Sequence, residues 1–230
     1  MRASIGLRKS GNADLYRHLA IPISLVSIAA IAVIGTHWVC HGPACGTHSL
    51  DARILHWFAS IRSRVLDDLL SVVTWLGSLA VLLPLAAVAM LWLIRRQERR
   101  EAIFVGAALL GISALAHLLK WMVARPRPNW HEAVIAVPLD LSFPSAHAAQ
   151  ITAFVMALVM VLRHLGMPRL ERVAAFGALL ILVVSVSRLY LQVHFPSDVL
   201  AGCLWAALWV AVLAHLLLVR DDTRRNVANL

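Results

Sequence analysis

Charged residues are scarce in this sequence. Asp, Glu, Lys and Arg make up only 14% of its 230 residues, whereas 60% are hydrophobic and the mean hydropathy is +0.78. A soluble globular domain carries about 25% charged residues. The composition therefore excludes an ordinary water-soluble fold and predicts an integral membrane protein.

The chain also lacks linkers: no Gly/Ser-rich stretch or low-complexity tract divides it. We therefore expect one domain over residues 1–230. Apolar windows of about 20 residues are long enough to cross a bilayer, and they predict an all-α bundle of six membrane-spanning helices. The windows lie near 19–38, 70–94, 102–122, 147–163, 171–187 and 198–219.

Two segments near the N-terminus need separate interpretation. The first apolar window follows basic residues as a secretory signal does, but it is longer than a signal core and no small-residue cleavage pattern follows it. We interpret it as a retained anchor. Residues 51–69 alternate apolar and charged positions with a helical period, which predicts an interfacial amphipathic helix after the first span.

Lys and Arg are unevenly distributed between alternate connections. Fourteen of the 21 lie before the first window, in the 95–101 and 163–172 connections and in the C-terminal tail. The positive-inside rule then predicts a bacterial-type inner-membrane protein with both termini in the cytoplasm. The formal net charge of +9 also suits nucleic acid, but topology and anionic lipid explain the basic 95–101 loop better. We predict no nucleic-acid partner.

Three polar clusters fall at the predicted outer ends of the helices. They are "KWMVARPRP" from Lys120, "LSFPSAH" from Leu141 and "SRLYLQVHFPSD" from Ser187. Taken singly, each suits snorkelling cations, a capping serine or an interfacial histidine. Their coincidence on one face of the membrane favours a site instead. Its candidate members are Lys120, Arg127, Ser145, Ala146, His147, Arg188, His194 and Asp198.

This set of side chains suits phosphoryl transfer. Cations and the free amides of a helix N-terminus can hold the phosphate oxygens. Of the two histidines, one can attack phosphorus and the other can protonate the leaving oxygen, while a carboxylate orients the attacking ring. No acidic cluster of metal-binding type accompanies them, so we predict a mechanism without metal or cofactor.

The clusters resemble the motifs K-x6-R-P, P-S-G-H and S-R-x5-H-x3-D of the type 2 phosphatidic acid phosphatase family. In this chain they run from Lys120 to Pro128, from Pro144 to His147 and from Ser187 to Asp198. The resemblance implies a six-helix membrane phosphatase that forms a phosphohistidine. It implies His194 as nucleophile, Asp198 as its orienting partner, His147 as general acid, and Lys120, Arg127, Ser145, Ala146 and Arg188 as the phosphate cradle.

One residue departs from the family pattern. Ala146 stands where the family has glycine, and alanine fits there if the residue is already helical. We therefore expect a working site.

We predict a phosphatase acting on a membrane lipid: undecaprenyl pyrophosphate, phosphatidic acid, phosphatidylglycerol phosphate or a lipid A phosphate. The soluble vanadium haloperoxidases share a similar motif set, but six spans argue against that class. The alternative from another class is a non-catalytic membrane protein that binds lipid phosphate. Intact His147, His194 and Asp198 disfavour it.

Other polar residues lie in the outward connections. Cys40 and Cys45 precede the predicted amphipathic helix, and an oxidising periplasm allows a disulfide between them. A metal site that adds His41 and His48 is the alternative, but these four ligands have no second scaffold, so we favour the disulfide. The polar loop residues His131, Glu132 and Asp140 are assigned no role.

Overall fold

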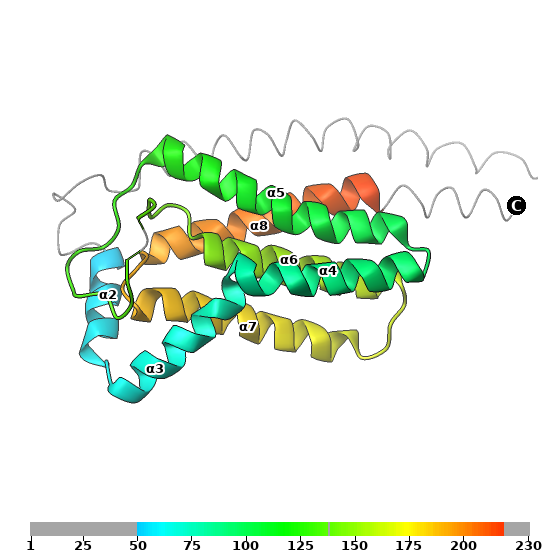
Figure 1. Cartoon of the computed structure of the whole chain (residues 1–230). Helices are drawn as coiled ribbons and strands as arrows, with labels where there is room; N and C mark the ends of the chain where they lie inside the picture. Colours follow the sequence, from blue (N-terminus) through cyan, green and yellow to red (C-terminus); the bar gives the residue numbers. More distant parts are fainter. Residues whose placement is uncertain (1–49, 138, 219–230) are drawn as a thin grey trace, which may run out of the picture.

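The computed structural model describes residues 50–137 and 139–218, and all regular elements within these ranges are helical. Figure 1 shows the long helices side by side, with α2 lying across one end of the bundle. The predicted first span, Cys40 and Cys45 lie outside the described residues. In chain order the elements are α2 (Leu50–Ser60), α3 (Arg64–Val73), the 3-10 helix η1 (Thr74–Gly77), α4 (Leu79–Arg95), α5 (Arg99–Val123), α6 (Ala146–His164), α7 (Leu170–Tyr190) and α8 (Pro196–Leu217).

Four of these helices, α5 to α8, are long and apolar enough to cross a membrane. Each matches a predicted window to within a few residues at either end. Residues Arg64–Gly77 and Leu79–Arg95 form a fifth candidate only if they count as one span bent by 44°. The outward surface carries large apolar side chains such as Leu110, Phe176 and Leu200, as expected of a surface that faces lipid.

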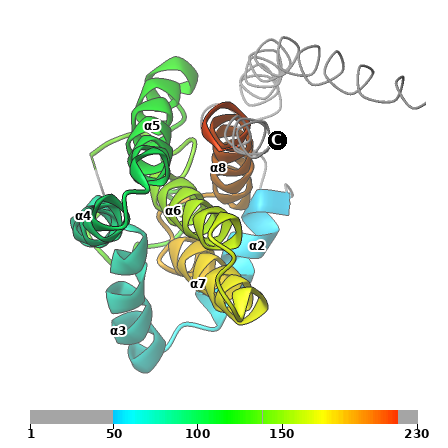
Figure 2. The same cartoon turned by 90° about the vertical axis from the view of Figure 1, so that its right-hand side faces the viewer.

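Helix α6 is the central element of the bundle. It packs against α4, α5, α7 and α8, and Figure 2 shows it surrounded by them in the end-on view. Its buried residues include Ala149, Ala153 and Ala157, each with no exposed surface. Small side chains let helix backbones approach closely, and in lipid this packing is a main source of helix association. The first turn of α6 is thus held on several sides.

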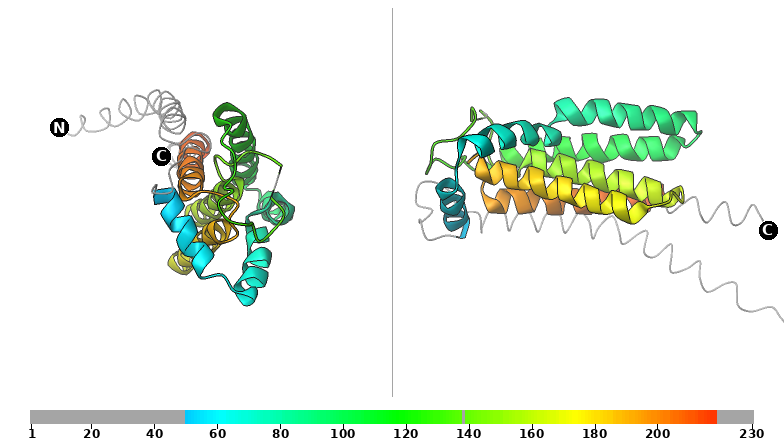
Figure 3. Two further views of the ribbon diagram at one scale, coloured as in Figure 1. Left: turned by 90° about the vertical axis from the view of Figure 1, so that its left-hand side faces the viewer. Right: turned by 90° about the horizontal axis from the view of Figure 1, so that it is seen from below.

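The predicted single helix over residues 51–69 is wrong. The structure divides this segment into α2 and α3, and in Figure 3 the two lie in different directions. Ser63 causes the break because it has an extended backbone, and its side chain accepts a hydrogen bond from the amide of Leu66 at 3.4 Å. This N-cap starts a new helix.

The second predicted window, 70–94, is also interrupted. Ser78 has an extended backbone, and its hydroxyl donates to the carbonyl of Trp75 at 2.7 Å. Helix α4 begins at the next residue, Leu79. A hydropathy window averages over such a break, so it reports one apolar stretch where the backbone forms a short 3-10 helix and a new α-helix.

The N-terminal turns of α6 and α8 are in close contact at Gly202. A Cβ atom added there would lie 2.6 Å from the carbonyl oxygen of Ser145. The amide of Ser145 also donates to the carbonyl of Asp198 at 3.0 Å. Backbone therefore packs on backbone at this point, and no side-chain rotation can make room.

We expect Gly202→Ala to lower the free energy of unfolding by about 1–3 kcal/mol, because the two helices must separate to admit the methyl group. Gly106→Ala is the matched control. Its added Cβ would meet only the flexible end of Met90, at 3.2 Å, so that variant should be neutral or slightly stabilised. Thermal unfolding of the purified proteins in detergent measures both. Equal midpoints for the two variants would contradict a rigid contact at Gly202.

Candidate active site

The eight predicted site residues come together at one end of the bundle, the end that α2 crosses in Figure 1. The C-terminal part of α5 brings Lys120, and the last turn of α7 brings Arg188. Helices α6 and α8 begin at the same end and bring Ser145, Ala146, His147 and Asp198. The connections between these helices contain Arg127 and His194.

Local sequence explains where α5 ends and where α6 and α8 begin. Helix α5 stops at Ala124, which has a left-handed backbone with φ of 49°. Prolines 126 and 128 then favour an extended backbone for the residues before them. Ser145 is the N-cap of α6, so Pro144 precedes the cap and lies outside the helix. Pro196 does occupy the first turn of α8.

His194 is buried, with 1% of its surface exposed. Its Nε2 atom lies 3.2 Å from Nη1 of Arg127. A guanidinium can only donate, so Nε2 is the acceptor and the ring proton is on Nδ1. Nδ1 lies 3.5 Å from Oδ2 of Asp198 and 3.5 Å from Oγ of Ser142. Asp198 thus faces Nδ1, the ring nitrogen that does not point toward Arg127, at a distance longer than a direct hydrogen bond.

The electrostatic surroundings of His194 keep its ring neutral. Burial, followed by the nearby charges of Arg188 and Arg127, lowers the pKa of His194 well below its ordinary value. A neutral imidazole carries a free electron pair on Nε2 at physiological pH. This is the protonation state that a nucleophile requires.

Lys120 and Arg127 share one carboxylate, that of Asp140. Oδ2 of Asp140 lies 3.1 Å from Nζ of Lys120, and its Oδ1 accepts a hydrogen bond from Nη2 of Arg127. Partial burial opposes ionisation, but the hydrogen bond from Arg127 and the charge of Lys120 lower the pKa of Asp140 to about 2. Asp140 is therefore an anion at neutral pH. Its carboxylate binds Lys120 and Arg127, the two cations that we assigned to the phosphate cradle from the sequence.

Arg188 and Ser145 keep unpaired polar atoms inside the site. Nη1 of Arg188 donates to Thr74 Oγ1 at 2.7 Å, while its buried Nε has no partner among the described residues. The hydroxyl of Ser145 is buried and also unpaired there, so Ser145 occupies the N-cap position of α6 without making a capping hydrogen bond through its side chain. Buried polar groups usually have partners. These two are positioned to receive a ligand with acceptor oxygens.

The 3-10 helix η1 supports this side of the site. Besides Thr74, it contributes Gly77, where an added Cβ would lie 3.0 Å from the carbonyl oxygen of His147. His147 itself is half-buried in the first turn of α6, directly after Ala146. Ala146 is the first helical residue, so the residue that replaces the family glycine has a backbone that alanine readily adopts.

Sequence reasoning missed several residues of the site. Ser142 is fully buried and donates to Oδ2 of Asp198, as does the amide of Phe195 at 2.9 Å. Arg125 is also buried and binds Oδ1 of Asp198 at 2.6 Å. Its neighbour Pro126 and its place within the first cluster were available signals. Neither Thr74 nor Asp140 had a local signal, because only the fold brings them to the site.

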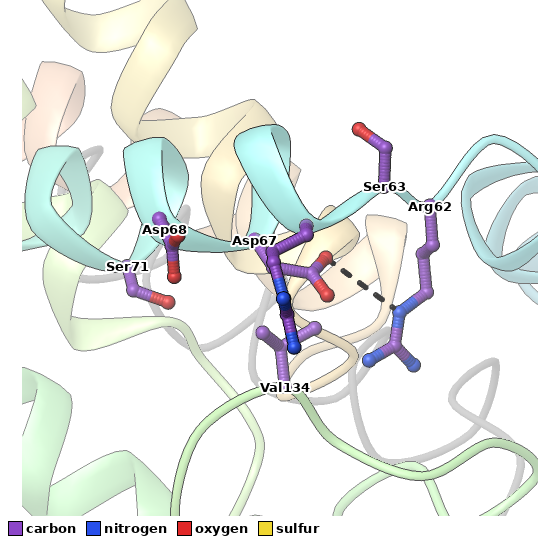
Figure 4. Close-up of a pocket in the computed structure, with 7 residues that line it drawn as sticks. Arg62, Ser63, Asp67, Asp68, Ser71 and Val134 are labelled. Atoms are coloured by element: carbon purple, nitrogen blue, oxygen red, sulfur yellow. Dashed lines mark ion pairs between the residues drawn. The ribbon is translucent and has the colours of Figure 1, made fainter.

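A separate hollow of about 480 Å³ opens beside α3. Figure 4 shows its polar lining, with the ion pair between Arg62 and Asp67 at 3.9 Å. None of the predicted site residues lines it; the lining consists of Arg62, Ser63, Arg64, Asp67, Asp68, Ser71 and Val134. In the described ranges, no group of three or more His, Cys, Asp or Glu side chains is placed to hold a metal ion.

Comparison with known proteins identifies the family. The pattern of the PAP2 superfamily matches residues 101–221, which include all three motifs. The chain therefore belongs to the PAP2 superfamily, and the resemblance drawn from the motifs is confirmed.

Three curated relatives are similar to parts of the chain. The decaprenylphosphoryl-5-phosphoribose phosphatase of Mycobacterium tuberculosis is 38% identical over 109 residues, which cover 46% of this chain and 55% of that protein. The chain thus aligns with only about half the length of this relative. Phosphatidylglycerophosphatase B of Bacillus subtilis is 25% identical over 79% of this chain and 87% of its own length. Undecaprenyl-diphosphatase BcrC of the same species is 28% identical over 67% of this chain and 76% of its own length.

Two solved structures share the fold. A transmembrane PAP2-type phosphatidylglycerolphosphate phosphatase from Bacillus subtilis has a TM-score of 0.69 at 23% identity, covering 86% of this chain and 94% of that one. Aquifex aeolicus LpxE has a TM-score of 0.59, also at 23% identity, covering 72% of this chain and 94% of that one. The candidate spans among the described residues indicate a multi-pass membrane protein, and these two structures share its fold.

The position of Asp140 leads to a prediction about anion binding. Because its ionised carboxylate competes for Lys120 and Arg127, Asp140→Asn should bind inorganic phosphate or vanadate about 3- to 10-fold more tightly at pH 7. Titration calorimetry on the purified protein measures this affinity. Glu132→Gln, a change at an exposed residue of the same connection, is the control. Weaker anion binding in Asp140→Asn would instead mean that Asp140 holds the two cations in place.

Proposed function

We propose that this protein is a phosphatase that hydrolyses a phosphate group on a membrane lipid through a phosphohistidine intermediate. The observation that carries the proposal is the arrangement around His194. Its neutral ring presents Nε2 toward Arg127 and Nδ1 toward Asp198, and the unpaired atoms of Ser145 and Arg188 lie in the same site. A nucleophile and anion-binding donors are thus combined in one place.

In the proposed first step, Nε2 of His194 attacks phosphorus. A nitrogen–phosphorus bond forms while the bond from phosphorus to the lipid oxygen breaks, and His147 donates a proton to that leaving oxygen. Nδ1 keeps its proton, and the carboxylate of Asp198 stabilises the positive charge that develops on the ring. In the second step, a water molecule attacks phosphorus while His147 accepts a proton from it. The nitrogen–phosphorus bond breaks, which releases phosphate and free His194.

The cradle stabilises the charge of the transferring group. Lys120, Arg127 and Arg188 supply three cations, and Ser145 with the first amides of α6 supplies neutral donors. Arg127 leaves Nε2 of His194 and turns its donors to a phosphate oxygen when the substrate binds. These residues provide the positioning and charge stabilisation that phosphoryl transfer mostly needs, so the proposal includes no metal ion.

The substrate proposed is a lipid whose tail stays in the bilayer while its phosphate reaches the water boundary. The relatives support this class, since their names include a polyprenyl-linked phosphoribose, phosphatidylglycerophosphate and undecaprenyl diphosphate. The relative with 38% identity favours a polyprenyl-linked phosphate among them. Phosphatidic acid and lipid A phosphate complete the set to be compared.

The test is phosphate release from a panel of these lipids and from an activated aryl phosphate, in detergent with a chelator present, using the wild type, His194→Ala and His147→Ala. His194→Ala should abolish turnover of every substrate, because no leaving group replaces a missing nucleophile. The activity that His147→Ala retains should depend on the leaving group of the substrate. This variant should retain more activity on an activated aryl phosphate or a lipid diphosphate than on phosphatidic acid, whose alkoxide needs the proton.

The control is His215→Ala, in the last turn of α8 at the opposite end of that helix, and it should keep full activity. Equal loss on all substrates in His147→Ala would contradict the general-acid role. Turnover in His194→Ala would contradict the nucleophile assignment. Wild-type activity that required an added divalent ion would contradict the metal-free mechanism.

We further propose that the site faces the periplasm of a bacterial-type inner membrane and that both termini lie in the cytoplasm. A span near residues 19–38 would bring the number of membrane-spanning helices to six. The basis is the excess of Lys and Arg in the 95–101 and 163–172 connections. The site lies at the other end of the helices, beside the 124–145 connection.

A cysteine placed at exposed Asn129 should react with a membrane-impermeant thiol reagent in intact cells, because this connection is near the site. A cysteine at Gln97, which is also exposed, should react only after the cells are permeabilised. Cys40, Cys45 and Cys203 should be replaced in both variants to remove their background signal. The reverse pattern would place the active site on the cytoplasmic face.

A further inference from the structure

Arg125 is buried between two carboxylates outside the predicted phosphate cradle. Its Nη1 donates to Oδ1 of Asp198 at 2.6 Å, and its Nη2 donates to Oδ2 of Asp51 at 2.9 Å. Only 2% of the Arg125 side chain is exposed. The guanidinium also lies over the ring of Phe195, 3.8 Å from its centre. Arg125 therefore has a fixed position and orientation.

This arrangement sets the orientation of the Asp198 carboxylate. One of its oxygens, Oδ1, is bound by Arg125, and the other, Oδ2, accepts from the amide of Phe195 at 2.9 Å and from Ser142. Oδ2 is also the oxygen that faces Nδ1 of His194. Because both oxygens are held, the carboxylate cannot rotate away from the ring.

Helix α2 extends the same network beyond the motifs. Asp51, in the first turn of α2, binds Arg125 and also accepts from the amide and the hydroxyl of Ser197, at 3.0 and 2.5 Å. The hydroxyl of Ser197 in turn accepts from Nη1 of Arg125 at 2.7 Å. Asp51 thus fixes both the guanidinium and the first turn of α8, which carries Asp198.

Arg125 and Arg127 lie two residues apart on the same side of an extended segment, yet they bind different partners. Pro126 and Pro128 keep both arginines extended, and in an extended segment residues i and i+2 point to the same side. Arg127 then reaches His194 and Asp140, while Arg125 reaches Asp198 and Asp51. Arg127 thus has one carboxylate, which it shares with Lys120, whereas Arg125 is neutralised by two carboxylates.

We propose that Arg125 is a positioning residue: held by Asp51 of α2, it fixes Asp198 against Nδ1 of His194 and does not contact the phosphate. This inference rests on the proposed function, because its readout is phosphatase turnover. It adds α2 to the elements that the reaction needs.

The first test separates kcat from KM on a lipid phosphate. Arg125→Gln should lower kcat by about 100-fold, the effect expected when a reacting group is misplaced by about 1 Å, while KM stays within about twofold. Arg127→Gln, which removes a proposed phosphate contact, should raise KM. Arg53→Gln, at an exposed position of α2, should match the wild type. A rise in KM with unchanged kcat in Arg125→Gln would show that Arg125 binds the phosphate, and would overturn the inference.

Arg125→Lys keeps the buried charge, so it tests the inference even if Arg125→Gln does not fold. Lysine lacks the planar fork with which arginine binds both carboxylates. The kcat of Arg125→Lys should therefore fall about tenfold, to a value between those of the wild type and Arg125→Gln. Thermal unfolding identifies folded variants. A folded Arg125→Lys with wild-type kcat would overturn the inference.

The second test asks whether Asp51 acts through Arg125. Asp51→Asn alone should lower kcat about 3- to 10-fold, but in the Arg125→Gln background the further loss should be smaller, because only the contact between Asp51 and Ser197 remains to be lost. Multiplying effects would show that Asp51 acts independently and would overturn the network. A wild type without phosphatase activity would instead refute the proposed function, and the inference with it. An active wild type with normal Arg125 variants refutes the inference alone.

Discussion

Excess positive charge buried at one end of the bundle is the constraint on which this structure depends. Lys120, Arg125 and Arg188 are each at most 3% exposed. Removing a charge from water costs several kcal/mol unless a partner compensates. Asp198 and Asp51 compensate Arg125, and Asp140 is shared by Lys120 and Arg127. Arg188 donates to the hydroxyl of Thr74 and interacts with the charge of Asp140, which Lys120 and Arg127 already share. An incoming phosphate would supply the missing negative charge.

Much of this site was predictable from the sequence, and the reasons are local. The windows for α5 to α8 were correct because the apolar runs are uninterrupted and end at Pro, Arg or Lys. The eight motif residues came together because each lies within a few residues of a helix end, and alternate helices of an up-and-down bundle end on the same side. A motif at a helix terminus is thus placed once the topology is known.

The residues that were missed depend on contacts between distant segments. Asp51 meets Arg125 across 74 positions, and Ser142 meets Asp198 across 56. No periodicity or spacing rule relates such pairs. Asp140 lies in a connection whose polar residues had no local pattern, so its pairing with Lys120 was not predictable either. The Ser63 cap differs, because a serine before an amphipathic turn is a known start signal, and it could have divided the 51–69 segment correctly.

The helix ends themselves favour the charges that the site requires. Lys120 and Arg188 lie in the last turns of α5 and α7, where the helix dipole stabilises cations, and Asp198 lies in the first turn of α8, where it stabilises an anion. Each residue therefore suits its own helix before any tertiary contact forms. Antiparallel packing then brings cationic C-termini and amide-rich N-termini to one place. The resulting site combines fixed cations, a held carboxylate and a neutral histidine, and it needs few residues whose local preference opposes the fold.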